Sequence, residues 1–542
     1  MTQKDMRSGA QALVESLERA GTEVVFGYPG GNVVDIFDRI RAARFRFVLG
    51  RHEQGCTHMA DGYARATGRP GVVIVTSGPG ATNAITGLAT ANVDGVPMVL
   101  VSGQVPLTQI GTDAFQEADM TGICRAATKH SFLVKSADEI PETVAQAFYI
   151  ATHGKPGAVV IDIPRDVQEA LTAAPYPERI SLRAYHPEHA ATTAQVNRFA
   201  KLLNASRRPV LYAGGGVIAA NAAGDVDALA RKAGVPVVTT LMGIGSIDEG
   251  SPLALGMAGM HGSAAANAVL AEADLIIALG VRFNDRVTGP NIPHYARRAK
   301  IVHVDCDPSS IDKNVAAYLG IVADIKDLLT TVNSRVKPND RAEWLEKVAA
   351  WKRRPAYRPL HRSVIMPQAV VEAVGRAVRD RTILVADVGQ HQMWCAQYFR
   401  HSRPRCFLCS GGMGTMGFAI PAAIGAAIAR PDSKVVAVIG DGGAQMTAEE
   451  LIVAVEKRLP VTFVVVNNRR LGMVRQMQEE CFGARYCATT ISSPDFVKLA
   501  QAYGLKGLRV SDPAQLDAVI AKAVRARGPS LVEVMVEPEV NV

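Results

Sequence analysis

The sequence predicts an α/β protein made of three doubly wound parallel-sheet domains. Short apolar runs that end in glycine or polar turns alternate with helical patterns along most of the 542 residues, a pattern typical of parallel strands covered on both faces by helices. A chain of this length is too long for one hydrophobic core. Two stretches rich in proline and charged residues, 176–187 and 336–367, interrupt the alternation and are predicted to be linkers. We therefore expect domains at 1–180, 190–335 and 365–542.

Composition and charge exclude several classes of protein. The net charge of +8 is spread thinly, and the sequence has no run of Lys and Arg with interleaved aromatic residues, which weighs against nucleic acid as a partner. The first residues lead into an amphipathic helix without a signal segment, and no apolar run approaches the roughly 20 residues that span a bilayer. We expect a cytoplasmic protein with no membrane partner. Cys406 and Cys409 are predicted to be buried strand thiols, because no second pair or neighbouring His completes a zinc site.

The outer two domains resemble each other internally. Residues 62–104 can be laid beside 417–468, because each segment runs from a helix through Arg-Pro to a strand, a Gly-rich loop, a second helix and a second strand. The loop is Ser77–Gly80 in the first segment and an acidic Gly-Asp-Gly-Gly in the other. We expect the two domains to share a fold and to differ in task.

The middle domain has strand-then-glycine turns, "LYAGGGV" and "IIALGVRF", and a strand that ends in acids, "KIVHVDCD". Acids in this place can bind ribose hydroxyls in a dinucleotide fold. The fingerprint G-x-G-x-x-G is absent from this region, so its chemistry alone supports a nucleotide only weakly.

One unit of the third domain carries the clearest chemistry. A strand at 434–439, a helix at 447–457 and a strand at 461–466 are predicted to form a βαβ unit whose strands end at the same edge of the sheet. This brings Asp441 and Asn468 together at the edge where α/β proteins bind ligands.

The residue types at that edge suit a metal ion and a phosphate. The Asp441 carboxylate, the Asn468 amide oxygen and the backbone carbonyl of Arg470 are hard oxygen donors for Mg²⁺. Gly442 and Gly443 let the backbone approach a phosphate, and the following helix N-terminus favours negative charge. The sequence therefore predicts a diphosphate-bearing cofactor held through a metal at Asp441, Asn468 and Arg470.

A series of motifs resembles the thiamin-diphosphate enzymes, and in particular the acetohydroxyacid synthase (acetolactate synthase) catalytic subunits. From about residue 5 to the C-terminus these are "VFGYPGGNVVDIFD", "RHEQGCTHMADGYARATG", "SGPGATN", "GTDAFQEAD", "RFNDRVTG", "VGQHQMW", "GGMGTMGFAIPAAIGA" and "NNRRLGMVRQ". The resemblance implies an N-terminal pyrimidine-binding domain, a central FAD-binding Rossmann-like domain and a C-terminal diphosphate-binding domain. It also implies thiamin diphosphate, Mg²⁺ and FAD as cofactors.

The resemblance carries roles to individual residues. Glu53 is implied as the carboxyl group of the proton relay to thiamin, Met416 as the wedge that bends the cofactor, and Arg286 as the guanidinium that receives the second keto acid. The first-domain wall of the active site is implied at Gln104, Phe115 and Lys129. Residues implied to line thiamin diphosphate are Gly31 with Asn32, Glu53, Val388, Gly389, Gln390, His391, Gly414, Met416, Gly440, Asp441, Gly442, Gly443, Met446, Asn468 and Met473. Those implied for FAD are Lys155, Gly214, Gly215, Thr240, Met242, His261, Gly280, Arg282, Arg286, Asp305 and Asp324.

The activity implied by the resemblance is decarboxylation of pyruvate and ligation to a second 2-keto acid, in branched-chain amino-acid biosynthesis. It also implies a homodimer or homotetramer with active sites at the subunit interface, and a possible small regulatory subunit. Met477 stands where most relatives have Trp, which leaves pyruvate or 2-ketobutyrate open as second substrate. The alternatives are another thiamin-diphosphate enzyme, such as a pyruvate oxidase or a 2-keto acid decarboxylase, and a catalytically silent regulatory paralogue.

Overall fold

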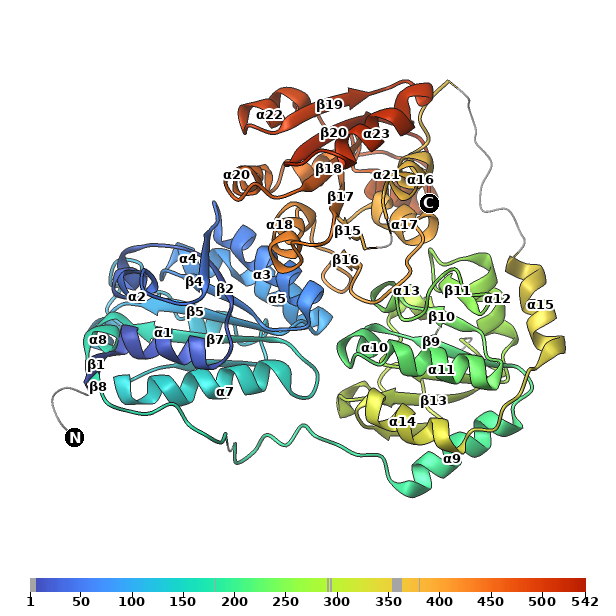
Figure 1. Cartoon of the computed structure of the whole chain (residues 1–542), viewed down its shortest axis with the longest axis horizontal. Helices are drawn as coiled ribbons and strands as arrows, with labels where there is room; N and C mark the ends of the chain where they lie inside the picture. The colour runs from blue at the N-terminus through green and yellow to red at the C-terminus, as the bar shows by residue number, and fades with distance from the viewer. Residues whose placement is uncertain (1–5, 181, 290–291, 293–294, 353–362, 380) are drawn as a thin grey trace.

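The computed structural model of the chain describes residues 6–180, 182–289, 292, 295–352, 363–379 and 381–542. These residues contain three six-stranded sheets, each formed by one continuous part of the chain (Figure 1). Neighbouring strands in all three sheets run parallel. The predicted α/β class with three parallel-sheet domains is confirmed. The domain boundaries themselves stay a prediction.

The first sheet has the strand order β3-β2-β4-β5-β7-β6. Its strands are β2 Val24–Tyr28, β3 Arg46–Leu49, β4 Gly71–Val75, β5 Met98–Gln104, β6 His130–Leu133 and β7 Ala158–Pro164, and β1 Arg7–Ser8 pairs separately with β8 Leu171–Thr172. The helices of this part are α1 Gly9–Arg19, α2 Val34–Ile40, α3 Glu53–Thr67, α4 Pro79–Asn83, α5 Ile85–Asp94, α6 Met120–Ile123, α7 Ile140–Thr152 and α8 Arg165–Glu169, with 3₁₀ turns at η2 Gly31–Val33, η3 Leu107–Gln109 and η4 Ala137–Glu139.

The third sheet has the order β16-β15-β17-β18-β20-β19. Its strands are β15 Ile383–Ala386, β16 Phe407–Cys409, β17 Val435–Gly440, β18 Val461–Asn467, β19 Lys506–Val510 and β20 Ser530–Met535. Its helices are α16 Pro367–Ala377, α17 Gln390–Tyr398, α18 Ala419–Ala429, α19 Asp441–Ala444, α20 Leu451–Glu456, α21 Gly472–Phe482, α22 Phe496–Ala502 and α23 Leu516–Val524, with 3₁₀ turns at η8 Ala448–Glu450 and η9 Pro513–Gln515. In both outer domains the strands follow the same spatial order, second, first, third, fourth, sixth, fifth. The predicted common fold of the outer domains is confirmed.

The middle sheet has the order β11-β10-β9-β12-β13-β14, which is the strand order of the dinucleotide-binding Rossmann fold. Its strands are β9 Pro209–Ala213, β10 Val237–Thr239, β11 Ala254–Met257, β12 Leu275–Leu279, β13 Lys300–Asp305 and β14 Leu319–Val322. Its helices are α9 Thr193–Ala205, α10 Gly215–Ala219, α11 Ala223–Ala233, α12 Ala264–Glu272, α13 Asp285–Thr288, α14 Ile325–Arg335 and α15 Ala342–Lys352, with 3₁₀ turns at η5 Leu241–Gly243 and η7 Pro308–Ser310.

Helix α15 lies in the stretch 336–367 that was predicted to be a linker. Its Trp344 and Val348 are buried in the core of the middle domain, and the Trp344 indole donates to the carbonyl of Pro209 at 3.1 Å. The prediction was wrong for this part of the stretch, because α15 is held by the burial of Trp344 and Val348 against distant parts of the middle domain, which the local composition does not reveal. Residues 353–362 lie outside the described residues.

The helix predicted at 447–457 is present but begins one residue later. Thr447 is its N-cap residue, with φ −142° and ψ 28°, and the 3₁₀ turn η8 then leads directly into α20. Its hydroxyl donates to the carbonyl of Gly417 at 2.8 Å. This contact ties the segment after α19 to the segment before α18.

The first and third domains meet where α3 packs against α18. Gly62 faces the backbone of Ala422 and Gly425 faces the backbone of Met59, so the two helices run antiparallel. A Cβ at Gly62 would lie 2.1 Å from the Ala422 oxygen, and a Cβ at Gly425 would lie 1.9 Å from the Met59 oxygen. Glycine at both positions is what allows the helix backbones to touch.

Adding one methyl group at this crossing is expected to destabilise the protein. For Gly62→Ala and Gly425→Ala we expect a loss of about 1–3 kcal/mol, the usual cost of forcing a methyl group into a packed core. Gly375 is an exposed helix residue with only Phe399 near, at 3.8 Å from the built Cβ, so Gly375→Ala should stabilise by about 0.5–1 kcal/mol. Thermal unfolding of the three variants checks this, and an unchanged melting temperature in both crossing variants would contradict it.

Candidate active site

The carboxyl edge of the third sheet brings together the two residues on which the metal prediction depends. Gly440, at the end of β17, is in register with Val466 of β18, so Asp441 and Asn468 follow neighbouring strands at the same edge. The Asp441 carboxylate accepts a hydrogen bond from the hydroxyl of Ser493 at 2.8 Å. Burial raises the pKa of Asp441. A cation beside such a buried carboxylate stabilises its charged form.

The turn after β18 shapes the remaining oxygen donors. Arg469 has φ 54°, a left-handed conformation that is rare for a residue with a side chain. The N–H of Arg470 donates to the Asn468 side-chain oxygen at 3.0 Å. Arg470 pairs with Thr490 in an isolated antiparallel bridge whose hydrogen bonds come from the flanking residues, which leaves its carbonyl available as a ligand.

Glycines and buried polar side chains line the same edge. The imidazole of His391 accepts the N–H of Gly440 at 3.2 Å, and a Cβ at Gly389 or Gly440 would lie 2.8 Å from that ring. The Oε1 atom of Gln390 is buried without a hydrogen-bond partner among the described residues. An open glycine backbone with an unpaired buried acceptor beside it fits a ligand with hydrogen-bond donors or a hydrated metal.

The loops carrying the other implied thiamin residues converge on this place. A Cβ at Gly442 would lie 3.3 Å from the methyl carbon of Met416, and a Cβ at Gly417 would lie 3.0 Å from the Cβ of Met446. Met446 is exposed. The structure therefore brings together the implied residues of this edge, which are Val388, Gly389, Gln390, His391, Gly414, Met416, Gly440, Asp441, Gly442, Gly443, Met446, Asn468, Arg470 and Met473.

Asp387 is a functional candidate that the sequence analysis missed. It is fully buried at the end of β15, and its carboxylate accepts the N–H of Val388 at 2.9 Å and that of Gly417 at 3.0 Å. It thereby joins the segment before α17 to the loop that carries Met416. The signal was an acid directly after the apolar run "ILVA".

Glu53 lies at the carboxyl edge of the first sheet, as the first residue of α3. Its carboxylate accepts the side-chain N–H of Asn83 at 3.0 Å. Nearby at this edge, the Asn32 amide donates to the hydroxyl of Ser77 at 2.6 Å, which fixes the turn that begins at Gly31.

Gln104 and Phe115 also belong to this edge. The amide of Gln104 donates to the carbonyl of Ala118 at 2.6 Å and to Asp162 at 3.0 Å, so Gln104 holds the loop that carries Phe115. The ring of Phe115 is 87% exposed, and its neighbours Asp113 and Gln116 have φ 59° and 63°. Strained backbone around an exposed aromatic ring is common at binding sites.

Lys129 is not brought together with these residues within one chain. It precedes β6 and therefore lies at the amino edge of the parallel sheet, opposite to Gln104. Its ammonium group donates to the carbonyls of Ile150 and His153 and to the hydroxyl of Tyr185, and burial lowers the pKa of Lys129 to about 8. In this chain Lys129 therefore caps the C-terminal end of α7 by binding its carbonyl groups.

Replacing Asp162 by Asn is expected to weaken the pH dependence of stability. Burial raises the pKa of Asp162 from 3.8 to about 7. Because the pKa is raised on folding, the folded chain keeps a proton between about pH 4 and pH 7 that the unfolded chain has lost, so raising the pH through this window destabilises the fold. Between about pH 5 and about pH 8, the melting temperature should fall further for the wild type than for the Asp162→Asn variant. Other titrating groups are common to both proteins, and equal falls would contradict the assignment.

The predicted flavin residues lie at the carboxyl edge of the middle sheet. They follow the successive strands: Gly214 and Gly215 after β9, Thr240 and Met242 after β10, His261 after β11, Gly280, Arg282 and Arg286 after β12, Asp305 at the end of β13, and Asp324 after β14. A Cβ at Gly214 would lie 2.0 Å from the oxygen of Gly280. This close approach of two turns, with a carboxylate farther along the edge, suits a dinucleotide. Lys155 reaches this edge from the first domain, and burial lowers its pKa with Arg282 close by.

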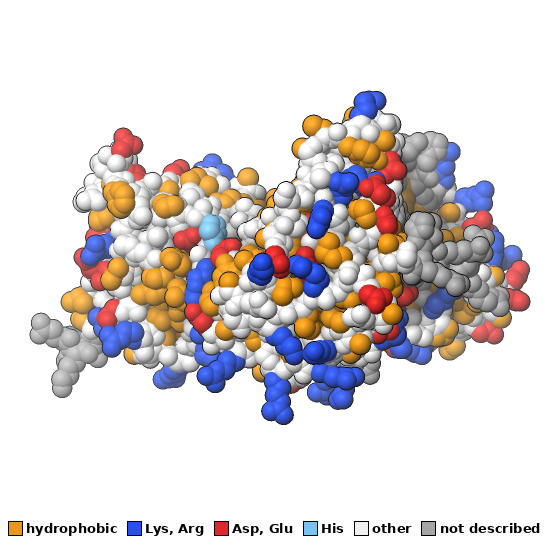
Figure 2. Space-filling view, turned by 90° about the horizontal axis from the view of Figure 1, so that it is seen from above, with side chains coloured by type: hydrophobic (Ala, Val, Ile, Leu, Met, Phe, Trp, Pro, Cys, Tyr) orange, Lys and Arg blue, Asp and Glu red, His pale blue; other side chains and the backbone are white. Residues whose placement is uncertain are grey.

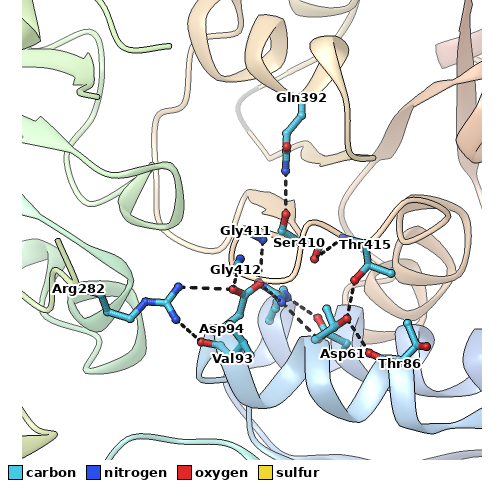
Figure 3. A network of polar contacts seen from close by, with 12 residues as sticks. Asp61, Thr86, Val93, Asp94, Arg282, Gln392, Ser410, Gly411, Gly412 and Thr415 are labelled. Atoms are coloured by element: carbon cyan, nitrogen blue, oxygen red, sulfur yellow. Dashed lines mark hydrogen bonds and ion pairs between the residues drawn. The ribbon is translucent and has the colours of Figure 1, made fainter. Parts of the chain in front are cut away.

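All three domains meet around the carboxylate of Asp94, whose side chain is buried at the end of α5 (Figure 3). It accepts the N–H of Gly411 at 2.9 Å, the N–H of Gly412 at 2.7 Å and a guanidinium N–H of Arg65 at 2.9 Å. Arg282 of the middle domain lies 3.9 Å from the same carboxylate. The Asp94 side chain of the first domain thus contacts both the start of the loop that carries Met416 and Arg282, a predicted flavin residue.

Glu53 and Met416 of one chain lie at opposite ends of the α3–α18 pair. The guanidinium of Arg65, near the end of α3, stands 5.4 Å from the centre of the Phe418 ring, two residues after Met416. Glu53 begins the same helix twelve residues earlier, which is about 18 Å along the helix axis. The antiparallel crossing therefore places the start of α18, which follows Met416, beside the C-terminal half of α3 and away from its first residue, Glu53.

Basic and acidic side chains are interspersed on the face shown in Figure 2. Arg286 is exposed and pairs with Asp285 at 3.5 Å.

Among the described residues no group of three or more His, Cys, Asp or Glu is placed to hold a metal, so a metal at Asp441 would depend on amide and carbonyl oxygens as well. No described helix has the length and apolarity needed to cross a membrane.

Three family models match successive parts of the chain. The N-terminal TPP binding domain of thiamine pyrophosphate enzymes matches residues 7–123, the central domain matches 196–332 and the C-terminal TPP binding domain matches 387–534. The fold and the edge around Asp441 therefore define a thiamin-diphosphate enzyme.

Similar proteins of known name show to which branch of the thiamin-diphosphate enzymes the chain belongs. The chain is 44% identical over 532 residues to the acetolactate synthase isozyme 3 large subunit of Escherichia coli, covering 96% of this chain and 92% of the relative. It is 46% identical over 530 residues to the acetolactate synthase of Mycobacterium bovis (95% and 86%). It is 43% identical over 560 residues to the mitochondrial acetolactate synthase catalytic subunit of Saccharomyces cerevisiae (99% and 81%). The chain belongs to the family of acetolactate synthase catalytic subunits.

Proposed function

We propose that this protein is an acetolactate synthase. It decarboxylates pyruvate and joins the remaining two-carbon unit to a second 2-keto acid, pyruvate or 2-ketobutyrate, giving 2-acetolactate or 2-aceto-2-hydroxybutyrate for branched-chain amino-acid synthesis. The observation that carries the proposal is the carboxyl edge at which Asp441 and Asn468 follow neighbouring strands, in a chain of this family.

The residues on the third sheet would hold the cofactor through its diphosphate. Asp441, Asn468 and the Arg470 carbonyl would ligate Mg²⁺, and the glycine backbone from Gly440 to Gly443 would lie against the phosphates. Thiamin diphosphate supplies, when bound, the electron sink for decarboxylation. Met416, whose methyl carbon lies 3.3 Å from a Cβ built at Gly442, would orient the cofactor.

Glu53 would hold and pass the proton needed for cofactor activation. Its position at the far end of α3 from Met416 supports a homodimer, or a homotetramer built from such dimers, in which Glu53 of one chain completes the edge of another. Gln104 and the exposed Phe115 would then form part of the wall over the substrate.

FAD is the proposed second cofactor, bound along the middle-domain edge between Gly214, Gly280 and Asp305. The close backbone approach of Gly214 to Gly280 supports it. Arg286, exposed at the end of this edge, is the proposed partner for the carboxylate of the second keto acid, since a guanidinium binds carboxylates through two hydrogen bonds. We propose the cytoplasm as the compartment and a small regulatory subunit as a possible further partner.

Product analysis tests the activity. The protein is incubated with pyruvate and 2-ketobutyrate in competition, with Mg²⁺ and thiamin diphosphate, with and without FAD. We expect 2-acetolactate or 2-aceto-2-hydroxybutyrate, and their ratio reports the preference at the Met477 position. Acetaldehyde or acetyl phosphate as the main product would assign another thiamin-diphosphate activity, and no turnover would indicate a silent paralogue.

A further inference from the structure

Glu450 is a third-domain carboxylate that contacts the first domain directly before Glu53. Its side chain is completely buried. One carboxylate oxygen accepts the N–H of Arg51 at 3.0 Å and the N–H of His52 at 3.0 Å, and the other accepts the N–H of Arg51 at 3.1 Å.

The first domain is shaped to receive this carboxylate. A Cβ at Gly55 would lie 2.0 Å from the nearer oxygen of Glu450, so only glycine in the first turn of α3 allows the approach. The oxygen also lies 3.6 Å from the Cβ position of Gly50, at the other end of the turn. Negative charge at the start of a helix is favourable.

The contact fixes the backbone that presents Glu53. His52 is the N-cap residue of α3 and its ring accepts the N–H of Gln54 at 3.1 Å. Glu450 accepts hydrogen bonds from the N–H groups of Arg51 and His52, the two residues before Glu53. The His52 ring accepts the N–H of Gln54, the residue after Glu53. We propose that Glu450 is a positioning residue that sets the place of the Glu53 carboxyl group, an inference that rests on the proposed function.

The physical reason is the accuracy that proton transfer needs. A catalytic carboxyl group displaced by about 1 Å can lose on the order of a hundredfold in rate. Glu53 begins α3, directly after the turn that follows β3. Within the first domain alone, two backbone N–H groups of this turn would lack a hydrogen-bond acceptor. A buried acceptor from another domain removes that freedom.

Two variants of Glu450 test the proposal in the full-length holoenzyme. Glu450→Gln keeps one acceptor oxygen and the volume of the side chain, and Glu450→Ala removes both acceptors. The primary readout is the rate of hydrogen-deuterium exchange at C2 of bound thiamin diphosphate. We expect a decrease of about tenfold to a hundredfold for Ala and a smaller one for Gln, with the dissociation constant for thiamin diphosphate changed by less than about threefold.

A second readout follows the turn itself without cofactor. Amide exchange of the peptide that contains Arg51 and His52 should be faster in Glu450→Ala than in the wild type. Glu449→Gln is the matched control, because Glu449 is the neighbouring carboxylate on the same turn η8, and it should behave as the wild type in both readouts. Faster amide exchange with an unchanged C2 rate would reduce Glu450 to a contact between domains and overturn the proposal.

Failure of the proposed function gives a different pattern. If the wild type does not accelerate C2 exchange, or if Glu53→Gln exchanges at the wild-type rate, the role of Glu53 is wrong and the positioning role falls with it. If both of these proteins behave as expected while Glu450→Ala exchanges like the wild type, only the inference about Glu450 is wrong.

Discussion

Asp441→Asn is expected to abolish Mg²⁺-dependent binding of thiamin diphosphate. Asp441 and Asn468 follow neighbouring strands at the same edge, and Asp441 is the only charged group among the three proposed ligands, so its removal leaves only neutral oxygens in that set. Changes in residues that merely support a metal ligand cost roughly 10–100-fold in affinity, and we expect the loss of the ligand to cost at least about a hundredfold. Titration of the apoprotein with thiamin diphosphate at fixed Mg²⁺, followed by calorimetry, measures the loss.

The stability of the apoprotein separates a lost ligand from a damaged fold. Burial raises the pKa of Asp441, so without a metal its charge is unfavourable and Asn should melt at the same temperature or higher. Saturating cofactor should raise the melting temperature of the wild type and leave that of the variant unchanged. Ser493→Ala removes only the hydroxyl that donates to Asp441 at 2.8 Å, and it should weaken binding much less. Wild-type affinity in Asp441→Asn would remove Asp441 from the site.

Glu53→Gln is expected to lower turnover by about 10²–10⁴-fold, the range for loss of a general acid-base group. The change keeps the side-chain volume and removes only the ability to exchange a proton. Glu53 is far from the diphosphate edge of its own chain, and the dissociation constant of the cofactor should therefore change little. Steady-state acetolactate formation and cofactor titration measure the two quantities.

Asn83 provides the control for Glu53. Its amide donates to the Glu53 carboxylate at 3.0 Å, so Asn83→Ala removes a hydrogen bond and keeps the acid. We expect a smaller loss, on the order of a few-fold to tenfold. Equal turnover in the wild type and Glu53→Gln would exclude Glu53 from the proton relay.

Local patterns predicted the fold class well because each parallel strand is a short apolar run with a turn after it. The repeated order of helix, Arg-Pro, strand and glycine loop also predicted that the outer domains share a fold. Sequence could not show that Gly62 and Gly425 are contact points between helices, because their partners lie more than 350 residues away along the chain. Helix α15 was missed for a related reason, since Trp344 is fixed by burial against Pro209 rather than by local propensity.

The candidate site was predictable where residue chemistry coincides with strand ends. Asp441 and Asn468 followed from that rule, and Glu53 followed from a motif. Asp387 was not found although an acid directly after an apolar run is a local signal. Asp94 and Glu450 were not found because a buried carboxylate that accepts backbone N–H groups from a distant segment leaves no local signature. Glu450 and Arg51 are 399 positions apart, and only the packing of α3 on α18 brings them together.

The most direct test of the account is whether Glu53 and Asp441 act in different chains. Two tagged chains are co-expressed and the mixed dimer is purified through both tags. A dimer of one Glu53→Gln chain and one Asp441→Asn chain keeps one complete site and should show about half of the wild-type rate, although each variant alone is inactive. A dimer of one wild-type chain and one chain with both changes has no complete site and should be inactive. The reverse result, an inactive first dimer and a half-active second one, would place both residues of each site in the same chain and contradict the account.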